Sequence, residues 1–262
     1  MVSISVVCGM ASQLLDYMGF IWFLVLDRPD VILFNEVKAT ERVLAALTTT
    51  LGYRYMQDSR CYLMKSLFSN VPSTNPMGRF KRGSAILYKP RNKFTVGNCG
   101  AEDLLVRDGA PEVEVVFADF KLKSGESYRL VSMYSLKDST DHFKTCVEAL
   151  KKMKSPSHPT IVAGDFNMKK DSFRSKWASE GWMDCLRPGW ATNITQGRVL
   201  TEIDYVMTSP NTKSDLLVHK PFRPTGSNVH CPIAFTVGDG INRGGQPCIQ
   251  FWGVSCSRPG QT

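Results

Sequence analysis

Three short apolar runs in this sequence carry acidic residues at or near their ends, and this pattern constrains the fold more than any other feature. The run VILF precedes Glu36, the run TIVA precedes Asp165, and the segment EIDYV contains Asp204. Short apolar runs rich in β-branched residues are typical of buried strands. In a layered α/β protein, residues at strand ends meet in one cleft. The sequence therefore predicts an α/β fold that gathers these carboxylates in one site.

Helices and short strands alternate along the whole chain, without an internal repeat. The predicted strands are Val2–Cys8, Val31–Phe34, Gly83–Tyr88, Val113–Lys121, Tyr128–Met133, Pro159–Ala163, Ile203–Met207 and Pro232–Val237. The predicted helices are Ala11–Leu26, Ala39–Leu51 and Thr140–Met153. Hairpin and crossover signals both occur, which indicates a mixed-sheet α/β protein rather than purely parallel winding.

The chain has 262 residues, a length at which sandwich and barrel folds often form a single domain. We place this domain at residues 1–237 and expect a loop or disordered tail at 238–262, where Gly, Pro, Asn and Gln dominate. The apolar stretch Tyr17–Leu26 is shorter than the roughly 20 residues of a membrane span. No Lys or Arg precedes it, so it also fits a signal peptide poorly. A buried helix is the favoured interpretation.

The net charge of +8 favours a polyanionic partner, such as nucleic acid, a phosphorylated ligand or an acidic membrane surface. The eight cysteines show neither CxxC pairs nor the spacing of zinc ligands. We interpret most of them as small buried hydrophobic residues in a reducing compartment. The expected location is therefore intracellular, in the nucleus or the cytoplasm.

Two further polar residues extend the acidic set. Asn167 follows Asp165 in the segment GDFN, and His230 immediately precedes the last predicted strand. Carboxylates can bind Mg²⁺ and activate water, while amide and imidazole groups can donate hydrogen bonds to phosphate oxygens. Taken singly, each residue is more often a cap, a turn residue or a satisfied core residue. As an ordered set, they predict metal-assisted phosphoryl chemistry.

Six sequence blocks together resemble the endonuclease/exonuclease/phosphatase family, which includes abasic-site endonucleases, DNase I-like nucleases, mRNA deadenylases and inositol phosphatases. The blocks are PDVILFNEV, GSAILY, VSMYSL, TIVAGDFN, EIDYVMTS and GSNVHCPI. The resemblance extends over almost the whole chain, and GDFN, IDY and HCPI are a strong signal together although each is weak alone. It implies an α/β fold of the DNase I-like type, a four-layered sandwich in which two mixed β-sheets pack face to face with helices outside.

The resemblance also implies a role for each matching residue. Glu36 would bind the metal ion, which is Mg²⁺ or alternatively Mn²⁺. Asp165 would orient or deprotonate the attacking water. Asn167 would contact the phosphate, and Tyr134 from the VSMYSL block would lie near the scissile phosphate.

In the same family pattern, Asp204 accepts a hydrogen bond from His230, and the protonated imidazole stabilises the pentacovalent phosphate. Two positions depart from this pattern. Val7 or Cys8 stands where the first strand of the family carries an asparagine, and Val229 stands where an aspartate precedes the histidine. Both changes remove oxygen ligands, which predicts weaker metal affinity or slower turnover.

Lys169, Lys170 and Arg174 follow the GDFN block directly and are candidates for phosphate or nucleic-acid contacts. The segment 172–196 is expected to be largely loop. Its residues Trp177, Trp182 and Trp190 could stack on a base, but core packing is the more frequent role of tryptophan. The favoured function is a metal-dependent phosphodiester hydrolase, a nuclease acting on DNA or RNA. Two alternatives stay open: a weakened or inactive family member that binds nucleic acid or protein, and a phosphatase of inositol or another small phosphorylated substrate.

Overall fold

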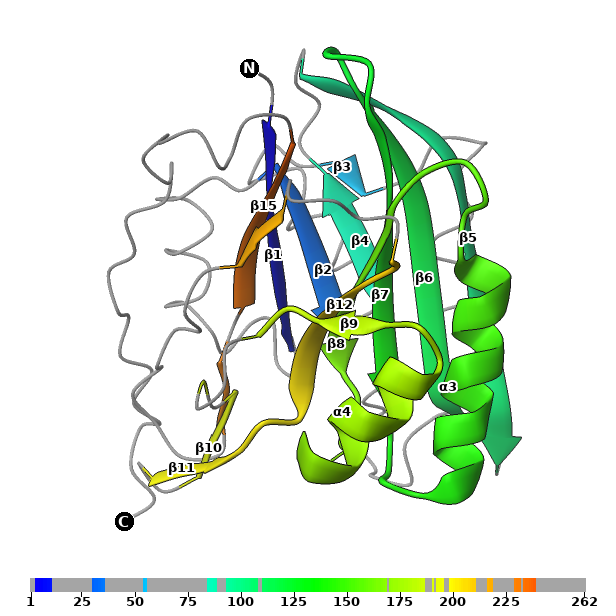
Figure 1. Ribbon diagram of the computed structural model, residues 1–262, viewed down its shortest axis with the longest axis vertical. Coiled ribbons are helices and arrows are strands. Elements are labelled where there is room, and N and C mark those ends of the chain that lie inside the picture. Colours follow the sequence, from blue (N-terminus) through cyan, green and yellow to red (C-terminus); the bar gives the residue numbers. More distant parts are fainter. Residues whose placement is uncertain are drawn as a thin grey trace, which may run out of the picture.

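Two six-stranded mixed sheets form the centre of the structure, which is a computed structural model of the chain (Figure 1). The first sheet contains β1 (Ser3–Met10), β2 (Val31–Asn35), β3 (Arg54–Tyr55), β4 (Ala85–Tyr88), β13 (Leu216–Val218) and β15 (Ile233–Gly238). The second contains β5 (Phe94–Arg107), β6 (Ala110–Leu122), β7 (Ser127–Ser135), β8 (Thr160–Asp165), β9 (Met183–Asp184) and β12 (Asp204–Thr208). The strand orders are β13-β15-β1-β2-β4-β3 and β5-β6-β7-β8-β12-β9.

The structure describes residues 3–10, 30–35, 54–55, 84–88, 93–107, 110–168, 170–186, 190, 192–195, 198–210, 216–218, 229–231 and 233–238. The predicted helices Ala11–Leu26 and Ala39–Leu51 lie outside these residues, and so does the predicted tail after Gly238. Among the helices within these ranges, none combines the length and the apolar character that crossing a membrane requires.

The two sheets face each other, because β2 contacts both β7 and β8, and β1 contacts β8. Buried hydrogen bonds join them. Asn35 Nδ2 donates to Ser132 Oγ of β7 at 3.1 Å, and Ser84 Oγ donates to Glu114 Oε2 of β6 at 2.9 Å. Side chains alternate between the two faces of a strand, so Ser132 and Glu114 identify the inner face of the second sheet. Within each sheet one pair is parallel, β1 with β2 and β7 with β8, which confirms the mixed-sheet prediction.

The helix α3 (Thr140–Met153) has the bounds that the sequence predicts. Ser139 caps its amino end by accepting a hydrogen bond from the backbone N–H of His142, and the apolar side chains of Val147 and Leu150 are buried. This helix contacts β5, β6 and β7, and Figure 1 shows it with α4 (Lys170–Ser179) beside the second sheet, on the side away from the first. The described part of the chain therefore has three layers: sheet, sheet and helices.

Two parts of the fold differ from the expectation. The sequence pattern predicts no element at 94–107, where the structure has the long edge strand β5. The segment 172–196 was expected to be largely loop, but it contains most of α4, the strand β9 and the strand β10 (Asn193–Thr195). With β11 (Arg198–Thr201) and β14 (Val229–His230), β10 forms a separate three-stranded sheet of order β11-β10-β14.

The described tryptophans lie in or against the core, and of the four cysteines whose side chains are described, three are buried and Cys185 is partly exposed. Trp177 is 1% exposed and its ring lies edge-on against Phe166 at a centroid distance of 5.8 Å. Trp182 is also buried. Among the described cysteines, burial raises the pKa of the Cys146 thiol to about 12, so this thiol stays protonated and unreactive.

Candidate active site

Asp165 lies between Tyr134 and Asp204 on three neighbouring strands of the second sheet. Asp165 ends β8, where it pairs in register with Tyr134 of β7 on one side and with Asp204 of β12 on the other. Residues in register on adjacent strands point to the same face, and Tyr134 is two residues from the inward-facing Ser132. The three polar side chains therefore form a row on the inner face. Tyr134 and Asp165 are each 1% exposed, and Asp204 is 7% exposed.

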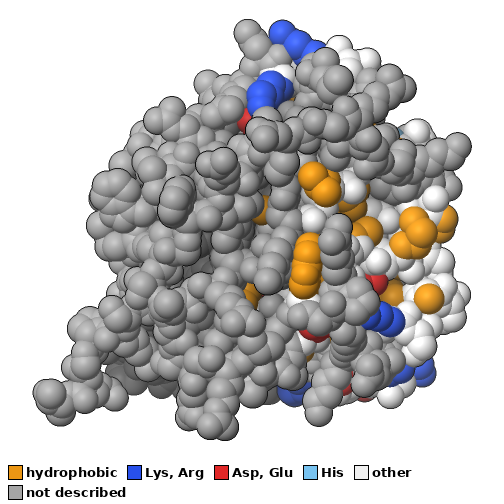
Figure 2. Space-filling view, turned by 60° about the vertical axis from the view of Figure 1, so that its left-hand side comes forward, with side chains coloured by type: hydrophobic (Ala, Val, Ile, Leu, Met, Phe, Trp, Pro, Cys, Tyr) orange, Lys and Arg blue, Asp and Glu red, His pale blue; other side chains and the backbone are white. Residues whose placement is uncertain are grey.

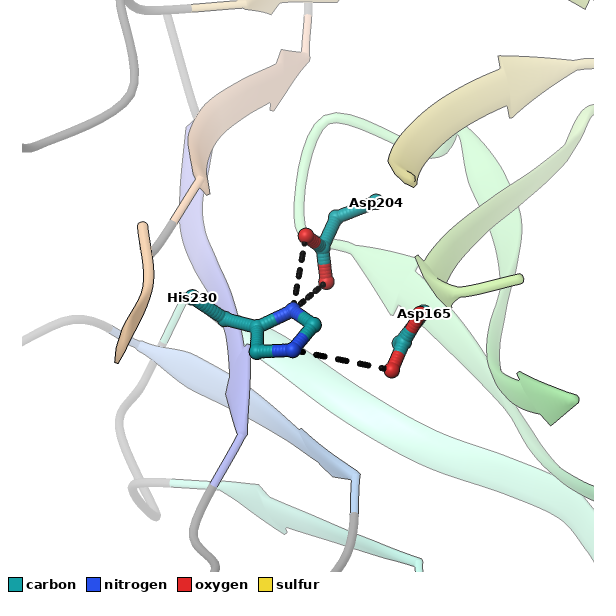
Figure 3. Close-up of side chains that lie close together, drawn as sticks. All are labelled: Asp165, Asp204 and His230. Carbon is teal, nitrogen blue, oxygen red and sulfur yellow. Dashed lines mark hydrogen bonds and ion pairs between the residues drawn. The ribbon is translucent and has the colours of Figure 1, made fainter. Parts of the chain in front are cut away.

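His230 reaches this row from β14 of the three-stranded sheet (Figure 3). Its Nδ1 lies 2.9 Å from both carboxylate oxygens of Asp204, and its Nε2 lies 4.0 Å from Oδ2 of Asp165. A carboxylate that accepts from Nδ1 fixes the tautomer and orientation of the ring. The structure thus brings together the Asp204–His230 pair that the family resemblance implies, and it directs the second ring nitrogen towards Asp165.

The GDFN segment holds Asp165 through local contacts. Asn167 has a φ of 50°, a left-handed conformation that asparagine tolerates better than most residues. Its backbone N–H donates to Asp165 Oδ1 at 2.9 Å, and its Nδ2 donates to Asp165 Oδ2 at 2.9 Å and to the Ser135 carbonyl at 2.8 Å. Both amide hydrogens therefore have partners within the chain. In this arrangement Asn167 orients the carboxylate of Asp165, and its contact with phosphate stays a prediction.

The glycine of the same segment is required by close backbone packing. A Cβ at Gly164 would lie 1.8 Å from the carbonyl oxygen of Met133 on the adjacent parallel strand. No side chain fits at that distance, so only glycine allows β7 and β8 to pair at the end that carries Tyr134 and Asp165.

Comparison with known proteins decides the family. The sequence profile of the Endonuclease/Exonuclease/phosphatase family matches residues 9–226. The chain belongs to this family. Its members are phosphoester hydrolases. A search of curated protein sequences finds no match.

Solved structures of this family confirm the predicted DNase I-like fold. A mannosyl-6-phosphatase from Bacteroides thetaiotaomicron superposes with a TM-score of 0.61 at 16% identity, covering 90% of this chain and 100% of that one. The human Nocturnin catalytic domain with bound sulfate gives 0.60 at 14% identity, covering 90% and 95%. D. rerio TDP2 complexed with a single-strand DNA product gives 0.59 at 15% identity, covering 90% and 99%. At these identities the likeness establishes the fold and leaves the substrate to be tested.

Within this family framework, the donor set suits a divalent cation. One ligand atom from each of Asp165, Asp204 and His230 lies within 4.8 Å of the other two. Both oxygens of Asp204 contact Nδ1 of the imidazole, whereas Oδ2 of Asp165 lies 4.0 Å from Nε2. Oxygen donors of this type are those that Mg²⁺ and Mn²⁺ prefer. The family pattern adds Glu36, which lies outside the described residues.

The residue before Glu36 is anchored against the site by a contact that the sequence does not predict. Asn35 is 1% exposed and donates from Nδ2 to Ser132 Oγ and to the Met133 carbonyl, each at 3.1 Å. These acceptors directly precede Tyr134. The end of β2 is therefore fixed to the end of β7. The sequence shows only an asparagine at the end of an apolar run, which does not by itself specify a hydrogen-bond partner.

The predicted phosphate-binding cations are only partly described. Lys169 lies outside the described residues, and only the backbone of Lys170 is described, at the start of α4. Arg174 donates from Nε to Asp184 Oδ2 at 2.6 Å and from Nη2 to the Leu186 carbonyl at 3.2 Å. These internal contacts fasten α4 to β9, and the contact of Arg174 with phosphate stays a prediction.

Tyr205 fixes the backbone on both sides of the site from the outer face of the second sheet. Its hydroxyl lies 2.6 Å from the Glu202 carbonyl and 3.0 Å from the Met168 carbonyl. Burial raises the pKa of the Tyr205 phenol, so the hydroxyl stays protonated, and its single proton is shared between these two acceptors. The phenol thus ties the segment after Asp165 to the segment before Asp204.

Proposed function

We propose that this chain hydrolyses phosphodiester bonds of nucleic acid with the help of a divalent metal ion, Mg²⁺ or Mn²⁺. The observation that carries the proposal is the position of His230, whose Nδ1 contacts Asp204 and whose Nε2 faces Asp165 at 4.0 Å. A carboxylate base and an imidazole acid that a second carboxylate orients are groups that support in-line attack on a phosphate bound between them. Family membership supports phosphoester hydrolysis as the reaction class.

Each residue of the row has a defined part in the proposed reaction. Asp165 orients the attacking water and accepts its proton, and Asn167 holds the carboxylate of Asp165 in place. A protonated His230 donates from Nε2 to a phosphate oxygen, while Asp204 stabilises the imidazolium through Nδ1. Tyr134 contributes a phenol beside Asp165 for contact with the phosphate.

Asp165 and Glu36 are the residues that we propose to hold the metal ion. A divalent ion bound there would supply positive charge to the non-bridging oxygens of the phosphate. The absence of an aspartate before His230 leaves few protein ligands, so we expect weak metal binding and a requirement for high metal concentrations.

The decisive experiment incubates the purified protein with labelled DNA and RNA in the presence of Mg²⁺ or Mn²⁺. We expect cleavage by the wild type and loss of cleavage in the double variant Glu36→Ala, His230→Ala. His158→Ala is the matched control, because it removes another histidine that contacts an aspartate, at 3.2 Å from Asp119, while leaving the row untouched. Equal products from the wild type and the double variant would refute the proposal. Release of phosphate from sugar or inositol phosphates alone would assign a small-molecule phosphatase instead.

Nucleic acid is the proposed substrate because the chain carries a net charge of +8. On the face drawn in Figure 2, the described Lys and Arg side chains lie in small separate groups rather than in one continuous patch. The identity of the contacting cations therefore has to be measured.

We predict that the double variant Lys169→Ala, Lys170→Ala weakens nucleic-acid binding and reduces the slope of log K against log salt by about 1–2. For each phosphate contact that the variant lacks, about one counterion fewer is released from the nucleic acid when the protein binds. The control is Lys151→Ala, Lys152→Ala, which removes the same charge from α3, where these lysines face Glu180 and Glu102. If both double variants reduce the slope equally, the effect comes from the overall charge of the protein and not from specific phosphate contacts near the GDFN segment.

A further inference from the structure

The pair Asp204–His230 spans two different sheets, which raises the question of what keeps its geometry. Asp204 begins β12 of the second six-stranded sheet, whereas His230 ends β14 of the three-stranded sheet. The two residues are 26 positions apart, yet Nδ1 lies 2.9 Å from both carboxylate oxygens. A contact of this kind survives only if the two backbones are held at a fixed separation.

Thr192 contacts the backbone on both sides of this pair. Its hydroxyl oxygen accepts hydrogen bonds from the backbone N–H of Ile203 at 3.1 Å and of Asp204 at 3.0 Å. Its carbonyl oxygen accepts from the backbone N–H of Cys231, the residue after His230, at 2.6 Å. Thr192 is 0% exposed, so water does not compete for these bonds.

The hydroxyl of Thr192 takes the place of a missing strand beside Asp204. On one side, Asp204 pairs with Asp165 of β8, and the bond there runs from the Phe166 N–H to the Ile203 carbonyl. The N–H of Asp204 points to the other side, where the described register of β9 reaches only Met207 and Thr208. A buried N–H needs an acceptor, and among the described residues Thr192 supplies it.

The hydrogen bond to the Thr192 carbonyl is continued by the antiparallel pairing of β10 with β14, the strand that carries His230. The next residue, Asn193, pairs in register with His230, and Ile194 pairs with Val229. One residue therefore fixes the first residue of β12 through its side chain and the end of β14 through its backbone. A shift at Thr192 would change the distance between Asp204 and His230 directly.

We propose that Thr192 is a positioning residue that sets the hydrogen bond between Asp204 and His230. For its kinetic consequence this inference rests on the proposed function, but its structural part does not. Thr192→Val keeps the volume and β-branching of the side chain and removes the acceptor. Thr192→Ser keeps the acceptor and should restore wild-type behaviour.

The test uses the full chain labelled with ¹⁵N-histidine, which is practical because the chain has four histidines. We expect the wild type and Thr192→Ser to show the hydrogen-bonded Nδ1–H signal of His230, assigned with His230→Gln, and Thr192→Val to lose or shift it. In the nuclease assay we expect kcat of Thr192→Val to fall about 10–100-fold with KM changed less, the range typical of residues that orient a histidine without touching the substrate, as known for histidine ligands of metals.

Thr160→Val is the matched control. Thr160 is also 0% exposed, and its hydroxyl accepts from the Ser155 N–H at 3.0 Å, but it lies at the opposite end of β8 from Asp165. It should lower stability without changing the His230 signal. An unchanged signal in Thr192→Val, or the same loss in Thr160→Val, would overturn the inference.

Two further measurements distinguish failure of this inference from misfolding of the variant and from failure of the proposed function. If Thr192→Val does not fold, Thr192→Cys replaces the hydroxyl with a weaker acceptor, and an unaltered His230 signal in that variant would overturn the inference. If the wild type cleaves no phosphodiester, the proposed function fails, while the His230 signal still decides the role of Thr192.

Discussion

Asp165→Asn lowers kcat by roughly 10²–10⁴-fold, the usual contribution of a positioned general base. The substitution keeps the shape of the side chain but removes its capacity to accept a proton from water. It also places an amide where the carboxylate accepts two hydrogen bonds from Asn167, each at 2.9 Å, so that one of these bonds is lost. The measurement is single-turnover cleavage of labelled nucleic acid at saturating metal, with circular dichroism to verify the fold.

If Asp165 had only a structural role, its substitution would lower stability and leave kcat unchanged. Asp119→Asn is the control, since Asp119 accepts two hydrogen bonds from Arg129, at 2.7 and 2.8 Å, next to the end of α3. That variant should unfold more easily and retain the wild-type kcat. A kcat for Asp165→Asn within threefold of wild type would remove Asp165 from the reaction and leave it as a structural anchor.

Local sequence patterns are sufficient to predict those helices and strands whose own residues indicate the structure. The helix Thr140–Met153 has a capping serine, an acidic residue in its first turn and lysines in its last, so its bounds follow from short-range chemistry. The strand before Asp165 is a run of β-branched and small apolar residues, which predicts burial on both faces. The family blocks then placed the site at the ends of these strands.

Elements that depend on distant partners could not be predicted in this way. The strand β5 contains Gly97, Asn98 and Gly100, which disfavour a strand locally, and it is held by a long antiparallel pairing with β6. The helix α4 has few apolar residues, and among its side chains that the structure describes, Trp177 is the large buried one. In both cases tertiary contacts outweigh local propensity.

The same limit applies inside the site. The sequence blocks name Asp165, Asp204 and His230 because their residue types match a known pattern. Nothing in the local sequence distinguishes Thr192 or Asn35 from other polar residues near a strand, since their partners are 11 or more positions away in the chain. Their contribution lies in the geometry that they impose on backbones from different elements.

Gly164→Ala is the substitution with the largest expected effect on stability. The added Cβ would lie 1.8 Å from the carbonyl oxygen and 2.8 Å from the carbonyl carbon of Met133, which are both backbone atoms that cannot rotate away. The strands β7 and β8 must separate, at a cost of about 3 kcal/mol or more in the free energy of unfolding. For a chain of this size we expect Tm to fall by roughly 6–12 °C. Thermal unfolding followed by circular dichroism measures this directly.

Activity of the folded fraction of Gly164→Ala separates a global effect from a local one. Separation of β7 from β8 would move Tyr134 away from Asp165, because these residues pair in register one position beyond the contact. We therefore expect kcat to fall even at temperatures where the variant is fully folded. Gly97→Ala is the control, because a Cβ there meets its nearest neighbour, Asp119 Cβ, at an ordinary 3.7 Å. A Gly164→Ala variant as stable as Gly97→Ala would show that the β7–β8 pairing does not need glycine. The inference that close packing of these two strands aligns Tyr134 with Asp165 would then be refuted.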